Sequence, residues 1–464
     1  MPPAERLREV MPTGMILTSP AQLASYESDA LGFKRFRPDA VVIPGCAAEL
    51  IGVVRLLKDQ AVPFTLRGAG TSLSGGPVAA QGGVVVHTSR LRRIEKISPT
   101  EMYALVECGV VLQQLDQALQ PHGLYYPPDP SSAPSATLGG NVATNAGGAH
   151  CLRYGVTSNY VLGVEAVLLD GSVVTFGGPA GGRGPYRDDW KRLMVGSEGT
   201  LAAFTRLWLR LIPQPAKVWT FRATFLGIEA VSAAITHLAT HVSCPAAIEL
   251  MDPRSVAMVE NSPMAVGLPA ERFMLLAEID GPAPLVDHRV DAVAAILREC
   301  GSDDVAFSDE PDIRAALWKA RKAQGGLLGQ ISPDFLVQDA VIPKSQLAEI
   351  LQFIYDEADR SGIPVATVIH AGDGNLHPNF LFDSRRPADV AAVEGLSKRL
   401  MRRVMEVGGT LSGEHGIGND KAMYMEEFVG PAGVAMQMAI PRAFNPRHQL
   451  NPEKIFPERH FASP

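Results

Sequence analysis

Two short segments carry residue types that bind metals or move protons. The first, His370 to Pro378 (HAGDGNLHP), places two histidines around an Asp-Gly turn between apolar runs. The second, Thr410 to Gly418, places Glu414 among glycines. A hairpin brings side chains of its two strands to one side. Two imidazoles and a carboxylate form a facial metal site with open positions. A lone histidine is more often structural, but this set predicts a metal site of His370, His377 and Glu414.

Two further charged residues are candidates for catalysis. His415 cannot easily share the ligand direction of its neighbour Glu414, and an imidazole beside a metal suits a general base because its unperturbed pKa is about 6.5. Arg321, in the basic run Trp318 to Lys322, is the predicted carboxylate clamp, since a guanidinium matches a carboxylate with two parallel hydrogen bonds. The alternative for Arg321 is a solvated basic helix face.

Composition excludes several classes of protein. The 464 residues are 46% apolar, and 42 Lys and Arg against 49 Asp and Glu give a net charge of −7, which argues against nucleic-acid binding. The five cysteines lie far apart without a CxxC motif, so we expect a reducing compartment and no disulfide framework or iron–sulfur cluster. The first twenty residues lack a signal-peptide pattern and no apolar run approaches the ~18 residues of a membrane span. We therefore expect a cytoplasmic protein without a transmembrane segment.

The elements that position these residues follow from apolar periodicity. Before Pro213, a helical stripe from Leu50 to Leu57 lies between apolar strands, and Asp170-Gly171 predicts a hairpin. Beyond Pro215 the predicted order is β-α-β-β-α-β, the order of a ferredoxin-like half. Its predicted elements are strand 221–225, helix 228–240, strands 247–251 and 273–279, helix 285–298 and strand 305–308. They are followed by helix 343–360, strands 365–370 and 376–382, and helix 388–407.

Three Gly-rich segments predict a flat, phosphate-containing cofactor: the first runs from Arg67 to Gly76, the second from Pro128 to Gly148 and the third from Val195 to Leu201. The loop Arg67 to Gly76 has four glycines directly after a strand, so backbone N–H groups can approach a phosphate closely. It does not match the dinucleotide fingerprint, because the third glycine position is Leu73 and no helical pattern follows. The predicted cofactor-binding residues are Arg67, Gly68, Gly70, Thr71, Ser72, Gly75, Gly76, Pro128, Asp129, Thr137, Gly139, Gly140, Asn141, Thr144, Asn145, Gly147, Gly196, Glu198, Gly199 and Leu201.

Together these segments resemble the FAD domain of the vanillyl-alcohol-oxidase-type flavoproteins. The resemblance implies an α+β fold, with a two-subdomain FAD-binding domain and a ferredoxin-like α+β substrate (cap) domain. Many members of that family link the flavin to a histidine in the first loop. Thr71 occupies that place here, so the resemblance implies noncovalent FAD. The expected boundaries are 1–214 for the FAD domain, 215–410 for the cap domain and 411–464 for a C-terminal segment that returns to the FAD domain.

The full motif set resembles the FAD-linked 2-hydroxy-acid dehydrogenases, in the branch of the glycolate oxidase flavin subunit and D-lactate dehydrogenase. The resemblance implies a small 2-hydroxy acid substrate, such as glycolate or D-lactate. Its hydroxyl proton would go to His415 and its hydride to flavin N5, assisted by Zn, Mn or Fe. In the family the segment Leu450 to Phe456 returns to the flavin, so Asn451 is an expected ring contact. Val337 stands where 2-hydroxyglutarate enzymes carry a substrate-binding lysine, which argues against a dicarboxylate substrate.

Other functions compete with this one. A D-2-hydroxyglutarate-type dehydrogenase is one alternative. A flavin-binding companion subunit without its own chemistry should lack the metal motif, and an oxidase of alcohols or sugars needs neither metal nor carboxylate clamp. The electron acceptor is expected to be oxygen, a quinone, or partner iron–sulfur and flavin subunits, which could place the protein peripherally at the inner membrane.

Overall fold

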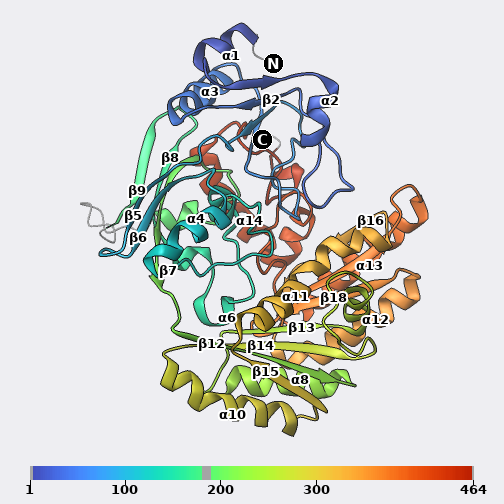
Figure 1. Ribbon diagram of the computed structural model, residues 1–464. Coiled ribbons are helices and arrows are strands. Elements are labelled where there is room, and N and C mark those ends of the chain that lie inside the picture. Colours follow the sequence, from blue (N-terminus) through green and yellow to red (C-terminus); the bar gives the residue numbers. More distant parts are fainter. Residues whose placement is uncertain (1–3, 180–189, 462–464) are drawn as a thin grey trace. The chain divides into compact units, whose positions relative to one another are not determined.

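The computed structural model describes residues 4–179 and 190–461, which divide into two compact units (Figure 1). Unit 1 consists of Met1–Gly147, Val156–Gln214 and Glu414–Pro464. Unit 2 consists of Gly148–Gly155 and Pro215–Gly413. The short segment Gly148–Gly155 belongs to unit 2, although the predicted boundaries assigned all of residues 1–214 to the FAD domain.

Unit 1 contains two main sheets, which form its two subdomains. In the first, ordered β1-β2-β4-β3, the strands β2, β4 and β3 run parallel, and helix α3 connects β2 to β3. The predicted stripe of α3 is buried from Leu50 to Leu57. The second sheet, ordered β5-β6-β10-β8-β9, is antiparallel, and its pair β8–β9 confirms the hairpin at Asp170-Gly171.

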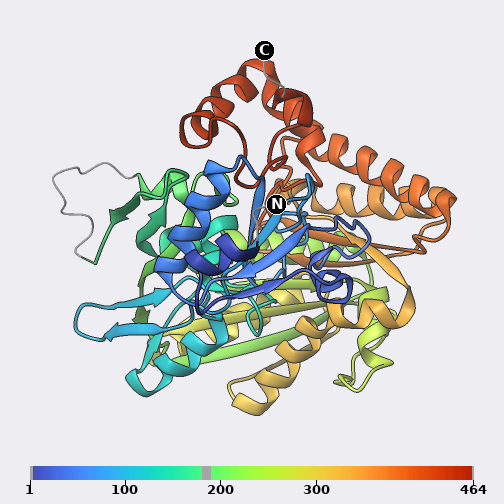
Figure 2. The same ribbon diagram turned by 90° about the horizontal axis from the view of Figure 1, so that it is seen from above.

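The strands of unit 1 are β1 (Met15–Leu17), β2 (Ala40–Ile43), β3 (Phe64–Arg67), β4 (Val84–His87), β5 (Ile94–Ser98), β6 (Tyr103–Glu107), β7 (Leu124–Tyr125), β8 (Val161–Val167), β9 (Val173–Gly177), β10 (Ala203–Arg210) and β11 (Ile212–Pro213). Its α-helices are α1 (Ala4–Val10), α2 (Pro20–Leu23), α3 (Ala47–Asp59), α4 (Leu112–Leu119), α5 (Leu138–Thr144), α7 (Lys191–Met194) and α14 (Met425–Phe444). The last of these belongs to the C-terminal segment, coloured red in Figure 2.

Unit 2 is built on one sheet with the order β15-β12-β14-β13-β18-β19-β16. Its first four strands have the ferredoxin-like order, as predicted. The strands are β12 (Lys217–Phe225), β13 (Ala247–Met251), β14 (Phe273–Gly281), β15 (Asp304–Ser308), β16 (Asp334–Val337), β17 (Ala340–Val341), β18 (Val365–His370) and β19 (Asn375–Phe382). The α-helices are α6 (Cys151–Tyr154), α8 (Ile228–Thr240), α9 (Pro253–Glu260), α10 (Ala283–Glu299), α11 (Pro311–Ile331), α12 (Leu347–Ser361) and α13 (Pro387–Glu406).

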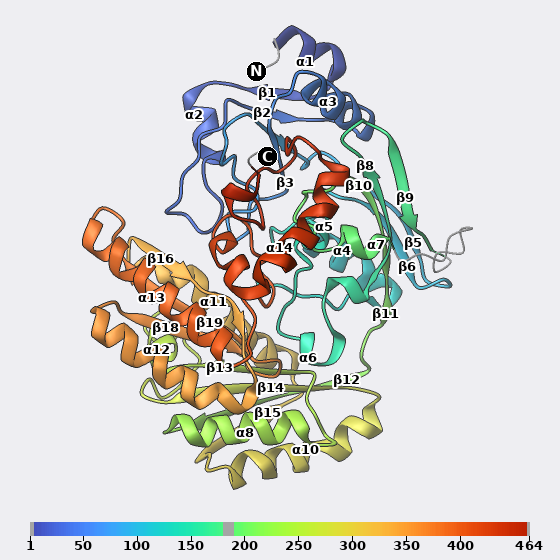
Figure 3. The ribbon, with the colours of Figure 1, turned by 180° about the vertical axis from the view of Figure 1, so that it is seen from behind.

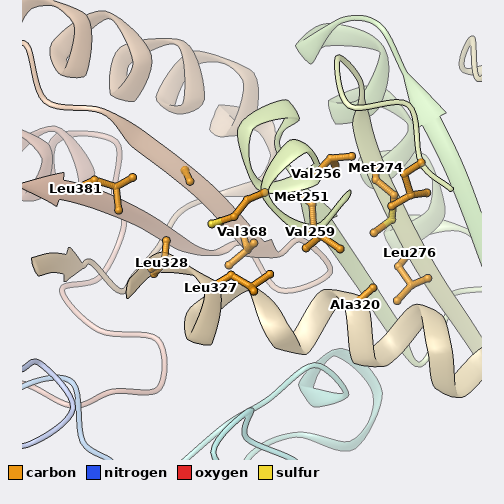
Figure 4. Close-up of a cluster of buried hydrophobic side chains, with 13 residues drawn as sticks. Met251, Val256, Val259, Met274, Leu276, Ala320, Leu327, Leu328, Val368 and Leu381 are labelled. Atoms are coloured by element: carbon orange, nitrogen blue, oxygen red, sulfur yellow. The ribbon is translucent and has the colours of Figure 1, made fainter. Parts of the chain in front are cut away.

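The helices of unit 2 cover the sheet on both faces. Helices α8, α10, α12 and α13 pack against one another on one face, as Figure 3 shows. Helices α9 and α11 pack on the other face around a core cluster (Figure 4) that includes Met251, Val259, Leu327, Leu328 and Val368. Helix α9 interrupts the predicted succession of two strands, and α12 begins at Leu347 rather than Pro343 because a 3-10 turn precedes it.

Candidate active site

The two predicted histidine ligands lie together on the β18–β19 hairpin of unit 2. His377 pairs with Val368, two residues before His370, so both histidines occupy the same face of the sheet. Their ring centroids are 5.0 Å apart, and one ring nitrogen of each lies within 4.8 Å of the other. Gly374 closes the turn at φ +82, where a Cβ would lie 2.3 Å from the carbonyl oxygen of Ile342.

Both histidines are held through Nδ1. In His370 this nitrogen lies 2.7 Å from Oε1 of Glu249, and in His377 it lies 3.3 Å from the carbonyl oxygen of Gln338. A carboxylate and a carbonyl only accept, so each Nδ1 donates its hydrogen and Nε2 of the neutral ring carries the lone pair. Metal-binding histidines are commonly oriented in this way.

Arg321 approaches the same carboxylate from helix α11. Its Nη2 lies 2.6 Å from Oε2 of Glu249, and its side chain is buried, so a solvated helix face is wrong for this residue. The pair is close but poorly aligned. Within the described residues, Nε and Nη2 of Arg321 have no well-aligned acceptor. The same is true of Nε2 of Gln324, which lies one turn further along α11. These buried donors could bind the carboxylate of a ligand.

Sequence reasoning missed Glu249 and Gln324. Glu249 is the one acidic residue in the apolar strand β13, and such a residue signals a buried partner. Gln324 lies three residues after Arg321, and this spacing places both on one helix face. Either signal was available, although neither identifies the partner.

The first two Gly-rich segments meet in unit 1. The loop after β3 passes so close to the second segment that a Cβ on Gly68 would lie 2.2 Å from Oγ1 of Thr137. Thr137 is the N-cap of helix α5, and its Oγ1 accepts a hydrogen bond of 3.4 Å from the N–H of Gly140. This helix was not predicted, because its sequence is rich in glycine. Deeper in the loop the N–H of Gly75 donates to the buried carboxylate of Asp29 at 2.8 Å.

The third Gly-rich segment joins the second through main-chain hydrogen bonds. The N–H of Gly196 donates to the carbonyl of Val142 at 2.9 Å, and that of Glu198 donates to Ala143 at 2.7 Å. All three segments therefore belong to one part of unit 1. The other predicted cofactor residues on these segments are Arg67, Gly70, Thr71, Ser72, Gly76, Pro128, Asp129, Gly139, Asn141, Thr144, Asn145, Gly147, Gly199 and Leu201.

Asn451 ties the C-terminal segment to this region. Its Oδ1 accepts from the N–H of Leu66 at 2.7 Å, and its Nδ2 donates to the carbonyl of Glu198 at 2.7 Å. The amide thus bridges strand β3 and the third Gly-rich segment. A contact between Asn451 and a flavin ring stays a prediction.

The turn that carries Glu414 and His415 runs from one unit to the other along the chain. In unit 2, the buried carboxylate of Asp339 accepts from the Oγ of Ser412 at 2.7 Å and from the N–H of Gly413 at 3.0 Å. Glu414 is the next residue and begins the last segment of unit 1, where its Oε1 lies 3.9 Å from Nε2 of His415.

Comparison with protein families agrees with both halves of this description. Residues 38–177 match a family of FAD binding domains. Residues 214–455 match the C-terminal domain of FAD linked oxidases. The chain belongs to the FAD-linked oxidases. It therefore has an FAD-binding domain followed by the C-terminal domain of that oxidoreductase family.

Curated relatives cover nearly the whole of this FAD-linked oxidase. The glycolate oxidase subunit GlcD of Escherichia coli (strain K12) is 36% identical over 455 residues, which are 98% of this chain and 91% of the relative. The GlcD subunit of Bacillus subtilis is 34% identical, over 93% of this chain and 92% of its own. A D-lactate dehydrogenase of Archaeoglobus fulgidus is 32% identical, over 89% and 90%.

Solved structures support the fold of the oxidase. p-Cresol methylhydroxylase matches with a TM-score of 0.79 and 17% identity, over 98% of this chain and 96% of its own. The 4-ethylphenol oxidase of Gulosibacter chungangensis matches with a TM-score of 0.77 and 18% identity, over 98% and 97%. The vanillyl-alcohol-oxidase-type fold is thereby confirmed. Among the described residues, no helix has the length and apolar character needed to cross a membrane.

Proposed function

We propose that this FAD-linked oxidase oxidises a small 2-hydroxy acid, glycolate or D-lactate, to the 2-oxo acid with the help of a divalent metal. The observation that carries the proposal is the orientation of His370 and His377, each of which holds Nδ1 on an acceptor. That arrangement suits a pair of metal ligands. The substrate class is supported by the relatives named glycolate oxidase subunit GlcD and D-lactate dehydrogenase.

His370, His377 and Glu414 would hold the metal. Their imidazole and carboxylate groups fit Zn, Mn or Fe. The carboxylate of Asp339 accepts a hydrogen bond from the N–H of Gly413, so the residue directly before Glu414 is held in place. When bound, such an ion lowers the pKa of a coordinated hydroxyl.

Arg321 and His415 would act on the substrate itself. The Nε and Nη2 of Arg321 are buried donors that can bind the substrate carboxylate, and Glu249 compensates the charge of this arginine when the substrate is absent. His415 would remove the hydroxyl proton. Bound FAD would supply the hydride acceptor, N5, for the hydrogen on the substrate Cα. Thr71 supports noncovalent attachment, because its hydroxyl offers no ring nitrogen for a flavin bond.

The electrons would leave to a quinone or to partner iron–sulfur and flavin subunits. Within the described residues the cysteines form no disulfide and none belongs to a group of candidate metal ligands. The word "subunit" in the name of GlcD supports a multi-subunit complex. We place the protein in the cytoplasm, peripheral at the inner membrane through these partners.

Anaerobic reduction of the flavin tests the proposal. The purified protein is mixed with glycolate, D-lactate, L-lactate or D-2-hydroxyglutarate without air, before and after treatment with a chelator. We expect glycolate or D-lactate to bleach the visible flavin absorbance, and chelation to abolish bleaching until Zn, Mn or Fe is restored. A yellow protein that none of the acids bleaches overturns the substrate class. Bleaching that persists after verified removal of metal overturns the metal's role.

A further inference from the structure

The carboxylate of Glu198 accepts hydrogen bonds from the turn that follows His415. Glu198 is only 7% exposed, and its oxygens accept hydrogen bonds of 2.7 Å from the backbone N–H groups of Ile417 and Gly418. All three residues belong to unit 1. Burial raises the pKa of the Glu198 carboxyl, and the hydrogen bonds from the amides of Ile417 and Gly418 act in the opposite direction, because they stabilise its charged form. The main chain just after His415 is therefore fixed from the third Gly-rich segment.

The turn has glycines where this approach requires them. At Gly416, with φ +86, a Cβ would lie 2.8 Å from Oε1 of Glu198. At Gly418, with φ +55, a Cβ would lie 2.0 Å from the carbonyl oxygen of Ser74. A side chain at either position would push the turn away from Glu198 or Ser74.

Ser74 supports the same turn from the first Gly-rich loop. Its Oγ donates to the carbonyl of His415 at 2.9 Å. Its own carbonyl accepts from the N–H groups of Asn419 at 2.9 Å and Asp420 at 3.0 Å. The two loops predicted to bind the cofactor thus hold both sides of the turn.

The backbone of Glu198 is itself rigidly held. It adopts φ 50, which is uncommon for a residue with a side chain. Its N–H donates to the carbonyl of Ala143, and its carbonyl accepts from Nδ2 of Asn451. Such a conformation persists only where surrounding contacts impose it, and it is concentrated at functional sites. Glu198 is therefore a fixed support for the turn.

We propose that Glu198 is a positioning residue, which sets the direction of the Glu414 and His415 side chains through the amides of Ile417 and Gly418. The inference rests on the proposed function, which assigns Glu414 to the metal and His415 to proton removal. A misplacement of about 1 Å at a reacting group can cost about 100-fold in rate.

The variant Glu198→Gln in the flavin-loaded protein tests this role. Glutamine accepts through one oxygen but presents an NH₂ group to the second backbone amide, so one hydrogen bond is lost. We expect hydrogen exchange at Ile417 and Gly418 to rise about tenfold or more. The flavin stoichiometry and visible spectrum should stay unchanged. The rate constant of anaerobic flavin reduction should fall about 10- to 100-fold, with little change in KM.

The matched control is Glu107→Gln. Glu107, on strand β6, is also a buried glutamate of unit 1. Its carboxylate accepts a hydrogen bond of 2.8 Å from the N–H of Arg93. The Glu107→Gln variant should show the same hydrogen exchange at Ile417 and Gly418, and the same rate constant of flavin reduction, as the unmodified protein. If Glu198→Gln does not fold, Gly416→Ala takes its place, because its Cβ pushes the turn off the same carboxylate. The same rise in exchange, with flavin retained, is then expected.

Two results would overturn the role of Glu198. One is unchanged exchange at Ile417 and Gly418 in the variant. The other is loss of flavin together with a normal reduction rate constant once FAD is added back, which would make Glu198 a cofactor-holding residue. The exchange measurement uses no substrate. Its failure is therefore distinct from failure of the hydroxy-acid assignment, which would appear as an unmodified protein that no acid reduces.

Discussion

Oε1 of Glu249 lies 2.7 Å from Nδ1 of His370, on the neighbouring strand of the same sheet. Glu249 is 1% exposed, and its other carboxylate oxygen lies beside Arg321. A carboxylate this deeply buried needs a positive or donating partner, and here it has both kinds. One side chain thus orients a proposed metal ligand and compensates the charge of the proposed substrate clamp.

Glu249→Gln should weaken metal binding about 10- to 100-fold, because the acceptor that orients His370 loses its charge. The affinity is measured by competition with a chromophoric chelator on the purified protein. Glu357→Gln is the matched control. Glu357 is a buried glutamate on α12 of unit 2, and its carboxylate accepts a hydrogen bond of 2.6 Å from Nε of Arg399. Equal metal affinities for the two variants would contradict the orienting role of Glu249.

His370→Ala and His377→Ala should each remove the metal and leave the flavin in place. We expect flavin reduction by the hydroxy acid to slow about a thousandfold, since a Lewis acid contributes several kcal/mol. Metal content by elemental analysis and flavin content by absorbance are measured on the same sample. His288→Ala, an exposed histidine of α10, serves as control. A variant that keeps its metal and its rate would remove that histidine from the ligand set.

The hairpin that carries the two histidines could be predicted because its information is local. Both strands are apolar, and the Asp-Gly turn between His370 and His377 leaves one way to fold them. The Gly-rich segments were likewise predictable as a cofactor site. Glycines in such density have few other uses.

Partners that lie far away in the sequence could not be predicted. Glu249 and His370 are 121 residues apart, and they meet because β13 pairs with β18, a relationship that no local pattern encodes. Helix α9 was different, because Asp252 and Pro253 form a standard helix start that the prediction overlooked. Arg321 is buried because α11 packs against the core through Leu327 and Leu328. The neighbouring basic residues Lys319 and Lys322 suggested an exposed helix face instead.

Arg321→Lys should raise KM for the hydroxy acid about 10- to 100-fold with a smaller effect on kcat. Lysine keeps a positive charge opposite Glu249 but loses the paired donors that match a carboxylate. Steady-state kinetics with an artificial electron acceptor give both constants. Lys322→Ala changes the exposed neighbour on α11 and should be neutral. An unaltered KM in Arg321→Lys would show that the substrate carboxylate is bound elsewhere.

Glu278 gathers donors from several elements of unit 2. Its carboxylate accepts hydrogen bonds from Trp318 at 2.7 Å, Thr220 at 2.8 Å and Arg314 at 3.3 Å, and lies 3.0 Å from Nε2 of His150. Burial alone would raise the pKa of Glu278. The hydrogen bond with His150 and the charges of His150 and Arg314 outweigh burial and lower this pKa from 4.5 to about 2.

Glu278 should therefore stabilise unit 2 above its unfolded-state pKa. A depressed pKa in the folded state favours the ionised form, so the stabilisation is present above pH 4.5 and is lost as the pH falls towards 2. We expect Glu278→Gln to lower the free energy of unfolding by urea on the order of 3 kcal/mol at neutral pH. The difference from the unmodified protein should shrink as the pH is lowered through that window. Glu299→Gln, at an exposed site of α10, should show a small difference at every pH, and a Glu278 effect that grew on acidification would contradict the assignment.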